Sequence, residues 1–289
     1  MSPDRHGSGA TRIEADLSIN RGERDLMRRA STCLAVLGLA LLALPGVASA
    51  TPTVKFKAEA VPIPGYEKGT GNILGAGAAL KATYQIEGTE YFGSPPPVIG
   101  INFFLPTGVK LHPSGFPTCN EEVLRQSGPI ACPKGSQAGP IGSVLGFVTF
   151  GGERVEETSE LFSFYKPGGG FIFFTDGHTP TSLEIYSSGH YLNYTGGGGF
   201  GPDLETIVPL VPSVPGAPFA SVKTIEGKFG SAIGPKNNPK KDTYYGREPT
   251  KCNKAAGLKL KTEVIFAENG EESKREPVTA FYTAPCPRK

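Results

Sequence analysis

Apolar and polar residues alternate with a period of two along most of the chain beyond residue 50. Val54, Phe56 and Ala58 alternate with lysines and a glutamate, and residues 80–86 repeat the pattern. Successive side chains of a strand point to opposite faces of its sheet, so this alternation predicts strands with one buried face. The same alternation, or a short apolar run, predicts further strands at residues 98–105, 141–150, 161–165, 171–175, 183–186, 191–195, 219–229, 258–266 and 278–282.

Segments rich in turn-forming residues separate the predicted strands. Glycine and proline account for 39 and 27 of the 289 residues, and both favour turns over regular elements. The pattern therefore predicts an all-β fold, an antiparallel β-sandwich built either as one large sandwich or as two small ones. On this basis residues 51–200 form a β-sandwich region, residues 201–218 a proline-rich linker or sheet edge, and residues 219–289 a C-terminal β region.

One short segment departs from the strand pattern. Residues 120–126 read Asn-Glu-Glu-Val-Leu-Arg-Gln, and Thr118 precedes Glu121 at the spacing of a capping box. Glu121 and Glu122 would lie in the first turn, where carboxylates interact favourably with the helix dipole. We therefore predict one short helix in this segment and assign its acidic residues a structural role.

The N-terminal segment has the organisation of a secretory signal peptide. Arg28-Arg29 precede an apolar run at residues 34–44, and Pro45 leads into Ala48-Ser49-Ala50. A basic region, an apolar region and a small-residue cleavage site in this order direct export. We predict a signal peptide at residues 27–50, cleaved after Ala50, and a non-native extension at residues 1–26. The alternative is an uncleaved membrane anchor; after cleavage, we expect no integral membrane span.

Four cysteines follow the predicted cleavage site: Cys119, Cys132, Cys252 and Cys286. An even number of cysteines in an exported chain predicts disulfides. Zinc needs clustered ligands, which these spacings do not supply, so we expect neither a metal site nor a cofactor.

The pairing of Cys252 with Cys286 has local support. Asn269-Gly270 is a strong signal for a two-residue hairpin turn. A regular hairpin about that turn places Cys252 opposite Pro287, and a one-residue bulge, for which Pro277 is a natural site, moves its partner to Cys286. Cys119 and Cys132 would then form the second disulfide and close a short loop.

One block of the sequence is similar to a known group of proteins. Phe116-Pro117-Thr118-Cys119, followed by Cys132-Pro133-Lys134-Gly135-Ser136, resembles a block in exported actinobacterial proteins of unknown function, and Pro285-Cys286-Pro287 is similar too. The resemblance extends loosely from about residue 70 to the end of the chain. It implies export and a regular fold, and because that group has no established activity it transfers no site residue.

Charge is balanced overall but unevenly distributed. Residues 51–289 contain 23 Lys or Arg against 22 Asp or Glu, whereas residues 223–261 contain ten basic and three acidic residues. This basic segment predicts either a site for an anionic envelope polymer or lipid headgroup, or a loop kept polar by lysine. Its core residues are Lys236, Lys240, Lys241, Arg247, Lys251 and Lys254. No nucleic-acid-binding motif accompanies them, so we expect no nucleic acid partner.

No catalytic motif is present, and the catalytic residues stay unassigned. Asp176, His178 and His190 lie near predicted strand ends, where they could converge as a metal site or a general base, or simply be solvated turn residues. Carboxylates at Glu153, Glu156, Glu157 and Glu160 leave a glycosidase open.

The sequence thus predicts a secreted or cell-envelope-associated protein with a non-catalytic binding or structural role. Its expected partner is an envelope polymer or a carbohydrate, because aromatic strands such as residues 171–175 could expose rings to a sugar instead of packing two sheets together. The alternative is a secreted hydrolase that acts on carbohydrate.

Overall fold

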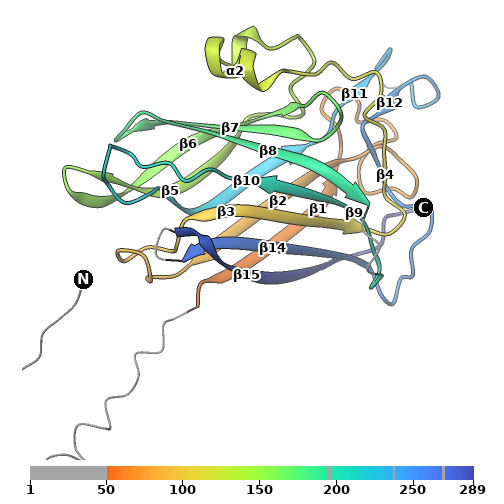
Figure 1. Ribbon diagram of the computed structural model, residues 1–289. Helices are drawn as coiled ribbons and strands as arrows, with labels where there is room; N and C mark the ends of the chain where they lie inside the picture. The colour runs from red at the N-terminus through yellow and green to blue at the C-terminus, as the bar shows by residue number, and fades with distance from the viewer. Residues whose placement is uncertain (1–50, 194–196, 237, 269–270) are drawn as a thin grey trace, which may run out of the picture. The chain divides into compact units, whose positions relative to one another are not determined.

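The computed structural model describes residues 51–193, 197–236, 238–268 and 271–289. The predicted signal peptide and the extension before it lie outside the described residues. One compact unit comprises Ala50–Lys289, and its main element is an antiparallel sheet of eleven strands (Figure 1). Neighbouring strands follow the order β1-β2-β10-β5-β6-β7-β8-β9-β3-β14-β15.

The strands of this sheet are eight to fourteen residues long. Their bounds are β1 Thr53–Val61, β2 Ala79–Glu87, β3 Val98–Pro106, β5 Gly142–Phe150, β6 Glu153–Tyr165, β7 Phe171–Thr179, β8 Leu183–Asn193, β9 Phe200–Ile207, β10 Ser221–Phe229, β14 Leu258–Glu268 and β15 Glu271–Ala284. The separate strands expected at residues 183–186 and 191–195 are one continuous strand, β8. All eleven strands pair antiparallel, which confirms the predicted fold class.

The sheet curls until its two edge strands, β1 and β15, lie side by side (Figure 1). Phe56 on β1 and Tyr282 on β15 pack with ring centroids 6.3 Å apart. Among the described residues β1 pairs only with β2 and β15 only with β14, so no hydrogen-bonded ladder joins the two edges. The inner faces of the two halves of the sheet therefore face each other around one interior, as in one large sandwich.

The inner face carries the main core. On β1 the alternation predicted from the sequence holds, since Phe56 and Ala58 are buried and Lys55 and Lys57 are exposed. Buried side chains from four strands form this core: Phe56, Ala58, Ala82, Tyr84, Ile86, Val98, Phe103, Leu105, Leu260, Val264 and Phe266. Apolar burial of this kind contributes about 25 cal/mol per Å² and is the dominant favourable term in folding.

The predicted helix, α2 (Glu121–Ser127), covers part of the outer face (Figure 1). Its buried Leu124 packs with Cys119 against Phe164, Ile172 and Phe174, which come from β6 and β7. Glu121 and Glu122 lie in its first turn, as predicted.

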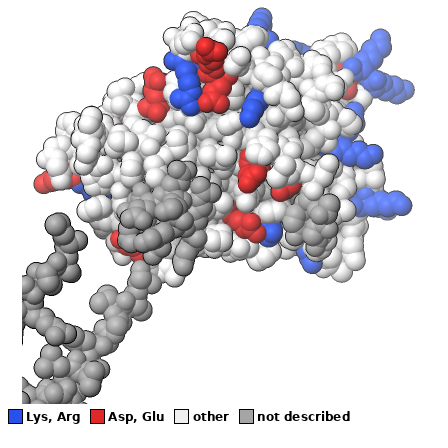
Figure 2. Space-filling model, viewed as in Figure 1, with Lys and Arg blue, Asp and Glu red and all other residues white. Residues whose placement is uncertain are grey.

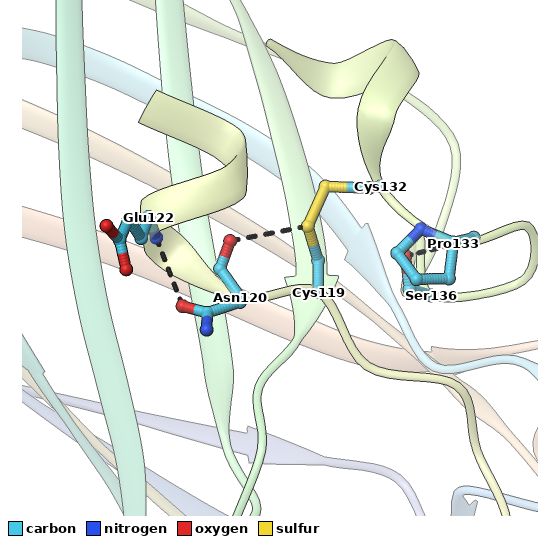
Figure 3. Close-up of a disulfide and its surroundings, with 6 residues drawn as sticks. All are labelled: Cys119, Asn120, Glu122, Cys132, Pro133 and Ser136. Atoms are coloured by element: carbon cyan, nitrogen blue, oxygen red, sulfur yellow. Dashed lines mark hydrogen bonds between the residues drawn. A yellow bond between two sulfur atoms is a disulfide. The ribbon is translucent and has the colours of Figure 1, made fainter. Parts of the chain in front are cut away.

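The prediction that Thr118 caps α2 was wrong. Asn120 caps the helix instead, because its Oδ1 accepts a bond of 3.1 Å from the backbone N–H of Glu122 (Figure 3). The Cys119 N–H donates to the Tyr165 carbonyl at 2.8 Å, which holds the chain extended up to Asn120 and delays the helix start.

Both predicted disulfides are present. Cys119 pairs with Cys132 (Figure 3), and Cys252 pairs with Cys286. A short 3-10 helix, η1 (Pro129–Ala131), precedes Cys132 and completes the disulfide loop that contains α2.

The predicted route to the second disulfide was wrong. Pro277 lies in regular register opposite Ile265, and the irregularity falls between Ala267 and Glu268. The predicted turn at residues 269–270 lies outside the described residues. Cys252 and Cys286 both lie beyond the β14–β15 ladder, so loop segments rather than opposed strands bring the two cysteines together.

The proline-rich segment is not an interdomain linker. Residues 200–207 form β9, which pairs on one side with β8 and on the other with β3. The C-terminal region is not separate either, because β10 lies between β2 and β5 and β14 lies beside β3. Residues 202–207 read Pro-Asp-Leu-Glu-Thr-Ile. Pro202 is the third residue of β9, where the register of the β3–β9 ladder is irregular, and bulges are among the places where strands tolerate proline.

Short strands close one end of the sheet, on the right in Figure 1. β4 (Lys110–Leu111) pairs with β13 (Gly246–Arg247), and β11 (Ala232–Ile233) pairs with β12 (Thr243–Tyr244). In the part of the chain that the structure describes, no helix is long and apolar enough to cross a membrane.

Candidate ligand-binding cavity

The interior of the curled sheet contains a cavity of about 380 Å³. This volume falls within the range of about 300–1,000 Å³ that small-molecule sites occupy. Aliphatic and aromatic side chains from most strands of the sheet make up the greater part of its wall, among them Leu80, Tyr84, Val98, Ile101, Phe103, Leu105, Val144, Leu161, Phe171, Phe173, Tyr191, Leu204, Val222, Ile225, Phe229, Leu260 and Tyr282.

The number of strands and the size of some side chains explain the cavity. A sheet of about eight strands that closes on itself is just wide enough for side chains to fill, and wider ones leave space. This sheet has eleven strands. Two of its lining residues, Ala58 on β1 and Ala82 on β2, are directly opposed in register and contribute only a methyl group each.

The lining extends along much of the sheet. On β3 the lining residues run from Val98 to Pro106, a length of about 26 Å at about 3.3 Å per residue. An apolar lining spread over such a length suits an extended chain.

A few polar residues interrupt the apolar lining. Thr175, Ser187 and Thr206 contribute hydroxyl groups from three consecutive strands of the sheet, β7, β8 and β9. Asn72, Arg247, Glu248 and Pro285 lie at the end of the cavity that the short strands close. The cavity therefore joins a long apolar section to a polar end.

Glu248 is the buried acid of that polar end, with 9% of its surface exposed. Burial raises the pKa of its carboxyl to about 7, because removal from water penalises the charged form. The described residues offer this carboxyl neither a hydrogen bond nor an ion pair. Arg247 next to it is engaged elsewhere: its guanidinium lies 4.8 Å from the centre of the Tyr244 ring, and Nη1 donates to the Gly75 carbonyl at 3.4 Å.

The predicted basic residues lie at the same end of the sheet. Lys236, Lys240 and Lys241 follow β11, Arg247 is on β13, and Lys251 and Lys254 lie between β13 and β14. The five lysines are exposed and Arg247 is partly buried. Figure 2 shows Lys and Arg side chains gathered at this end, beside β4, β11 and β12. We call the five lysines, with Arg247, the basic end.

The hypothetical group of Asp176, His178 and His190 does not form. His178 Nε2 lies 3.4 Å from Asp176 Oδ2, whereas His190 Nε2 lies 3.2 Å from Glu205 on β9. Asp176 is opposite Glu184, and His190 lies six residues further along β8, about 20 Å away. Three or more His, Cys, Asp or Glu side chains come together as a metal-binding group nowhere in the described ranges.

The side chains of the four clustered acids of β6 also lie in different surroundings. Glu153, Glu156 and Glu160 are exposed, and Glu156 pairs with Lys223. Glu157 is buried, and its Oε2 accepts bonds from the Thr181 hydroxyl at 2.7 Å and the Thr181 N–H at 3.3 Å. Glu156 and Glu157 therefore have structural partners of their own, and Glu153 and Glu160 are exposed.

Sequence reasoning missed the cavity and Glu248. The inward positions were visible as the apolar members of each alternating strand, including the small Ala58 and Ala82. Glu248 was visible only as one acid in a basic segment, and nothing in the sequence marks it as buried. Compared with known proteins, the chain matches no family model, no curated protein and no solved structure.

Proposed function

We propose that this chain is an extracytoplasmic, non-catalytic binding protein whose sheet encloses an elongated, mainly apolar molecule. The observation that carries the proposal is the cavity of about 380 Å³, whose mainly apolar wall follows β3 from Val98 to Pro106. A lipid-like chain suits such a space, since an apolar lining of that length can bury methylene groups along an extended chain. Ligand affinity then follows chain length, because each buried methylene contributes about 0.8 kcal/mol.

Export is the second part of the proposal. It is supported by the signal-peptide pattern that ends at Ala50 and by the disulfides Cys119–Cys132 and Cys252–Cys286, since such bonds persist in oxidising compartments. The test is the intact mass of the protein recovered from its native host. A mass that begins at Thr51, with four cysteines alkylated only after reduction, is expected; a retained leader would contradict export.

The third part concerns the basic end. Five exposed lysines next to the polar end of the cavity favour contact with an anionic lipid surface, because each basic side chain near such a surface contributes about 1 kcal/mol. A ligand could then pass between the membrane and the cavity without crossing water. If the basic end binds an acidic polysaccharide and not anionic lipid, the lipid surface is the wrong partner in this part of the proposal.

The central experiment measures ligand binding by displacement of a fluorescent apolar probe such as phenylnaphthylamine, since the chain has no tryptophan to report binding. A series of long-chain alcohols should bind with affinity that rises about fourfold per methylene until the cavity is full. Ala82→Phe, which fills the cavity at β2, should abolish displacement. Ala255→Phe at an exposed loop position is the matched control and should bind normally. Normal binding by a folded Ala82→Phe variant would refute the interior site.

A further inference from the structure

The Glu248 carboxyl differs from those of Glu157 and Asp242, two other buried acids, in accepting no hydrogen bond from the described residues. Glu157 accepts two bonds from Thr181, and Asp242 Oδ2 accepts the backbone N–H of Asn238 at 2.6 Å. The Glu248 backbone N–H is also satisfied, since it donates to the Ala76 carbonyl at 2.9 Å. Glu90 Oε1 and Oε2 are also buried without a hydrogen-bond partner, but Glu90 does not line the cavity, whereas Glu248 does.

A buried carboxyl without a donor is costly. Leaving a buried polar group without a hydrogen-bond partner destabilises the folded protein, and the effect is larger for a charged group. Burial also raises the pKa of Glu248 to about 7, because removal from water penalises the charged form. Arg247 donates no hydrogen bond to this carboxyl, because its guanidinium contacts the Tyr244 ring and the Gly75 carbonyl. A bound molecule with a donor at this end of the cavity would supply one.

We propose that Glu248 binds the hydrogen-bond-donating head group of an amphiphile whose chain occupies the cavity, and that this head is an amine or an alcohol rather than a carboxylate. This inference rests on the proposed function and deepens it by naming the ligand class. The long apolar section and the polar end share one lining, so one molecule can fill both.

The chemistry of the head group follows from the carboxyl. An ammonium group donates to the carboxylate and pairs with its charge, and a hydroxyl donates one hydrogen bond. A second carboxylate would bring two like charges together in a site shielded from water, where their repulsion is strong. Asn72 lines the same end; its amide oxygen can accept a hydrogen bond from either kind of head, and its NH2 group can donate to a hydroxyl.

The lysines of the basic end allow an effect of Glu248 to be distinguished from long-range electrostatic attraction. Its lysines attract anions over a distance and so favour a ligand carboxylate. A preference for the amine must therefore arise inside the cavity, against the field of the surrounding lysines. Only a short-range donor contact with a group such as Glu248 produces that result.

The experiment compares cetylamine, cetyl alcohol and palmitate, which share one chain length, as competitors of phenylnaphthylamine at about pH 8, where Glu248 is ionised. The wild-type protein should bind the amine at least about tenfold tighter than palmitate, since hydrogen bonds to charged groups are stronger than those between neutral groups. Glu248→Gln should reduce this preference to less than about threefold. Glu67→Gln removes an exposed charge and should preserve the preference.

The outcomes separate this inference from the proposed function. If no competitor displaces the probe, the interior site is wrong and the head-group inference falls with it. If all three bind the wild type equally, or if Glu248→Gln keeps the full preference, the cavity binds chains but Glu248 does not select the head. Retained affinity of Glu248→Gln for cetyl alcohol within about tenfold shows that the variant still folds and binds the chain.

Discussion

Phe56 on β1 and Tyr282 on β15 pack edge to face, with ring centroids 6.3 Å apart and an interplanar angle of 81°. They belong to the first and last strands of the sheet, which share no ladder in the described residues. Phe56 also contacts Tyr84 at 5.1 Å and Phe103 at 5.5 Å, so one ring links β1 to β2, β3 and β15. Side-chain packing, rather than backbone hydrogen bonding, holds the seam between the edge strands together.

Phe56→Ala should therefore lower the free energy of unfolding by about 3–5 kcal/mol, the usual cost of truncating a buried phenylalanine. The matched control is Phe150→Ala on β5, whose side chain is 54% exposed, and it should cost less than about 1 kcal/mol. Urea denaturation of both variants measures the difference. Equal losses of unfolding free energy in the two variants would show that the Phe56 ring does not hold the edge strands β1 and β15 together.

The two disulfides should differ in their effect on ligand binding. Their sequence separations of 13 and 34 residues correspond to about 3 and about 4 kcal/mol in the chain-entropy model. Replacing Cys252 and Cys286 by serine should weaken binding as well as stability, because these residues flank Pro285 and Glu248 at the polar end of the cavity.

The Cys119 and Cys132 double serine variant provides the control. That disulfide holds α2 on the outer face of β6 and β7, away from the cavity. It should lose stability with unchanged affinity for a long-chain alcohol, as measured by thermal unfolding and probe displacement. A loss of affinity in this variant, or none in the other, would contradict the location of the site.

Glu248 should make the stability of the protein depend on pH. Its pKa is about 7 in the folded protein against 4.5 for the free side chain, so the folded state binds more protons between these values. Stability is therefore full below about pH 4.5 and falls as pH rises to about 7, by about 3 kcal/mol in total. The other charged residues that line the cavity are Lys57, Glu59 and Arg247.

Glu248→Gln should remove this dependence and be more stable than the wild type above about pH 7. Urea unfolding at a series of pH values measures it. If the wild type and Glu248→Gln lose stability in parallel between about pH 5 and 7, the result would contradict the explanation that burial raises the pKa of the Glu248 carboxyl.

The basic end should determine binding to anionic vesicles. Lys240→Ala with Lys241→Ala should weaken co-sedimentation with phosphatidylglycerol vesicles about thirtyfold at low salt, at about 1 kcal/mol per lysine. Lys55→Ala with Lys223→Ala, two lysines on strands β1 and β10, should have much less effect. High salt should abolish the difference, since it screens exposed charges. If vesicle binding changes neither with salt nor in either double variant, the basic end is excluded as the surface that contacts anionic lipid.

Much of the fold was predictable because the strands alternate regularly. Lys55 and Phe56 lie on the faces that their pattern indicates, and both disulfides pair as predicted. β9 was not predictable, because Pro202 falls within it and prolines follow it, which made a strand paired on both sides resemble a linker.

The site was less predictable than the fold. A cavity depends on how far eleven strands curl and on which inward side chains fail to meet, and no local pattern encodes either. Glu248 is buried by segments distant in sequence, including Ala76, whose carbonyl accepts its backbone N–H. The histidines were misleading because they are close in sequence but not in space. A short segment separates His178 from His190, and the lengths of β7 and β8 place the two residues far apart.

The most direct test of the interior site is native mass spectrometry of the protein purified from its own host without detergent. The account predicts a mass above that of the disulfide-bonded polypeptide, an excess that organic solvent extracts and that fragmentation identifies as one long-chain amphiphile. The Ala82→Phe protein, purified in the same way, should lack it. A wild-type mass equal to that of the polypeptide alone, together with failure of every long-chain competitor to displace the probe, would contradict the account.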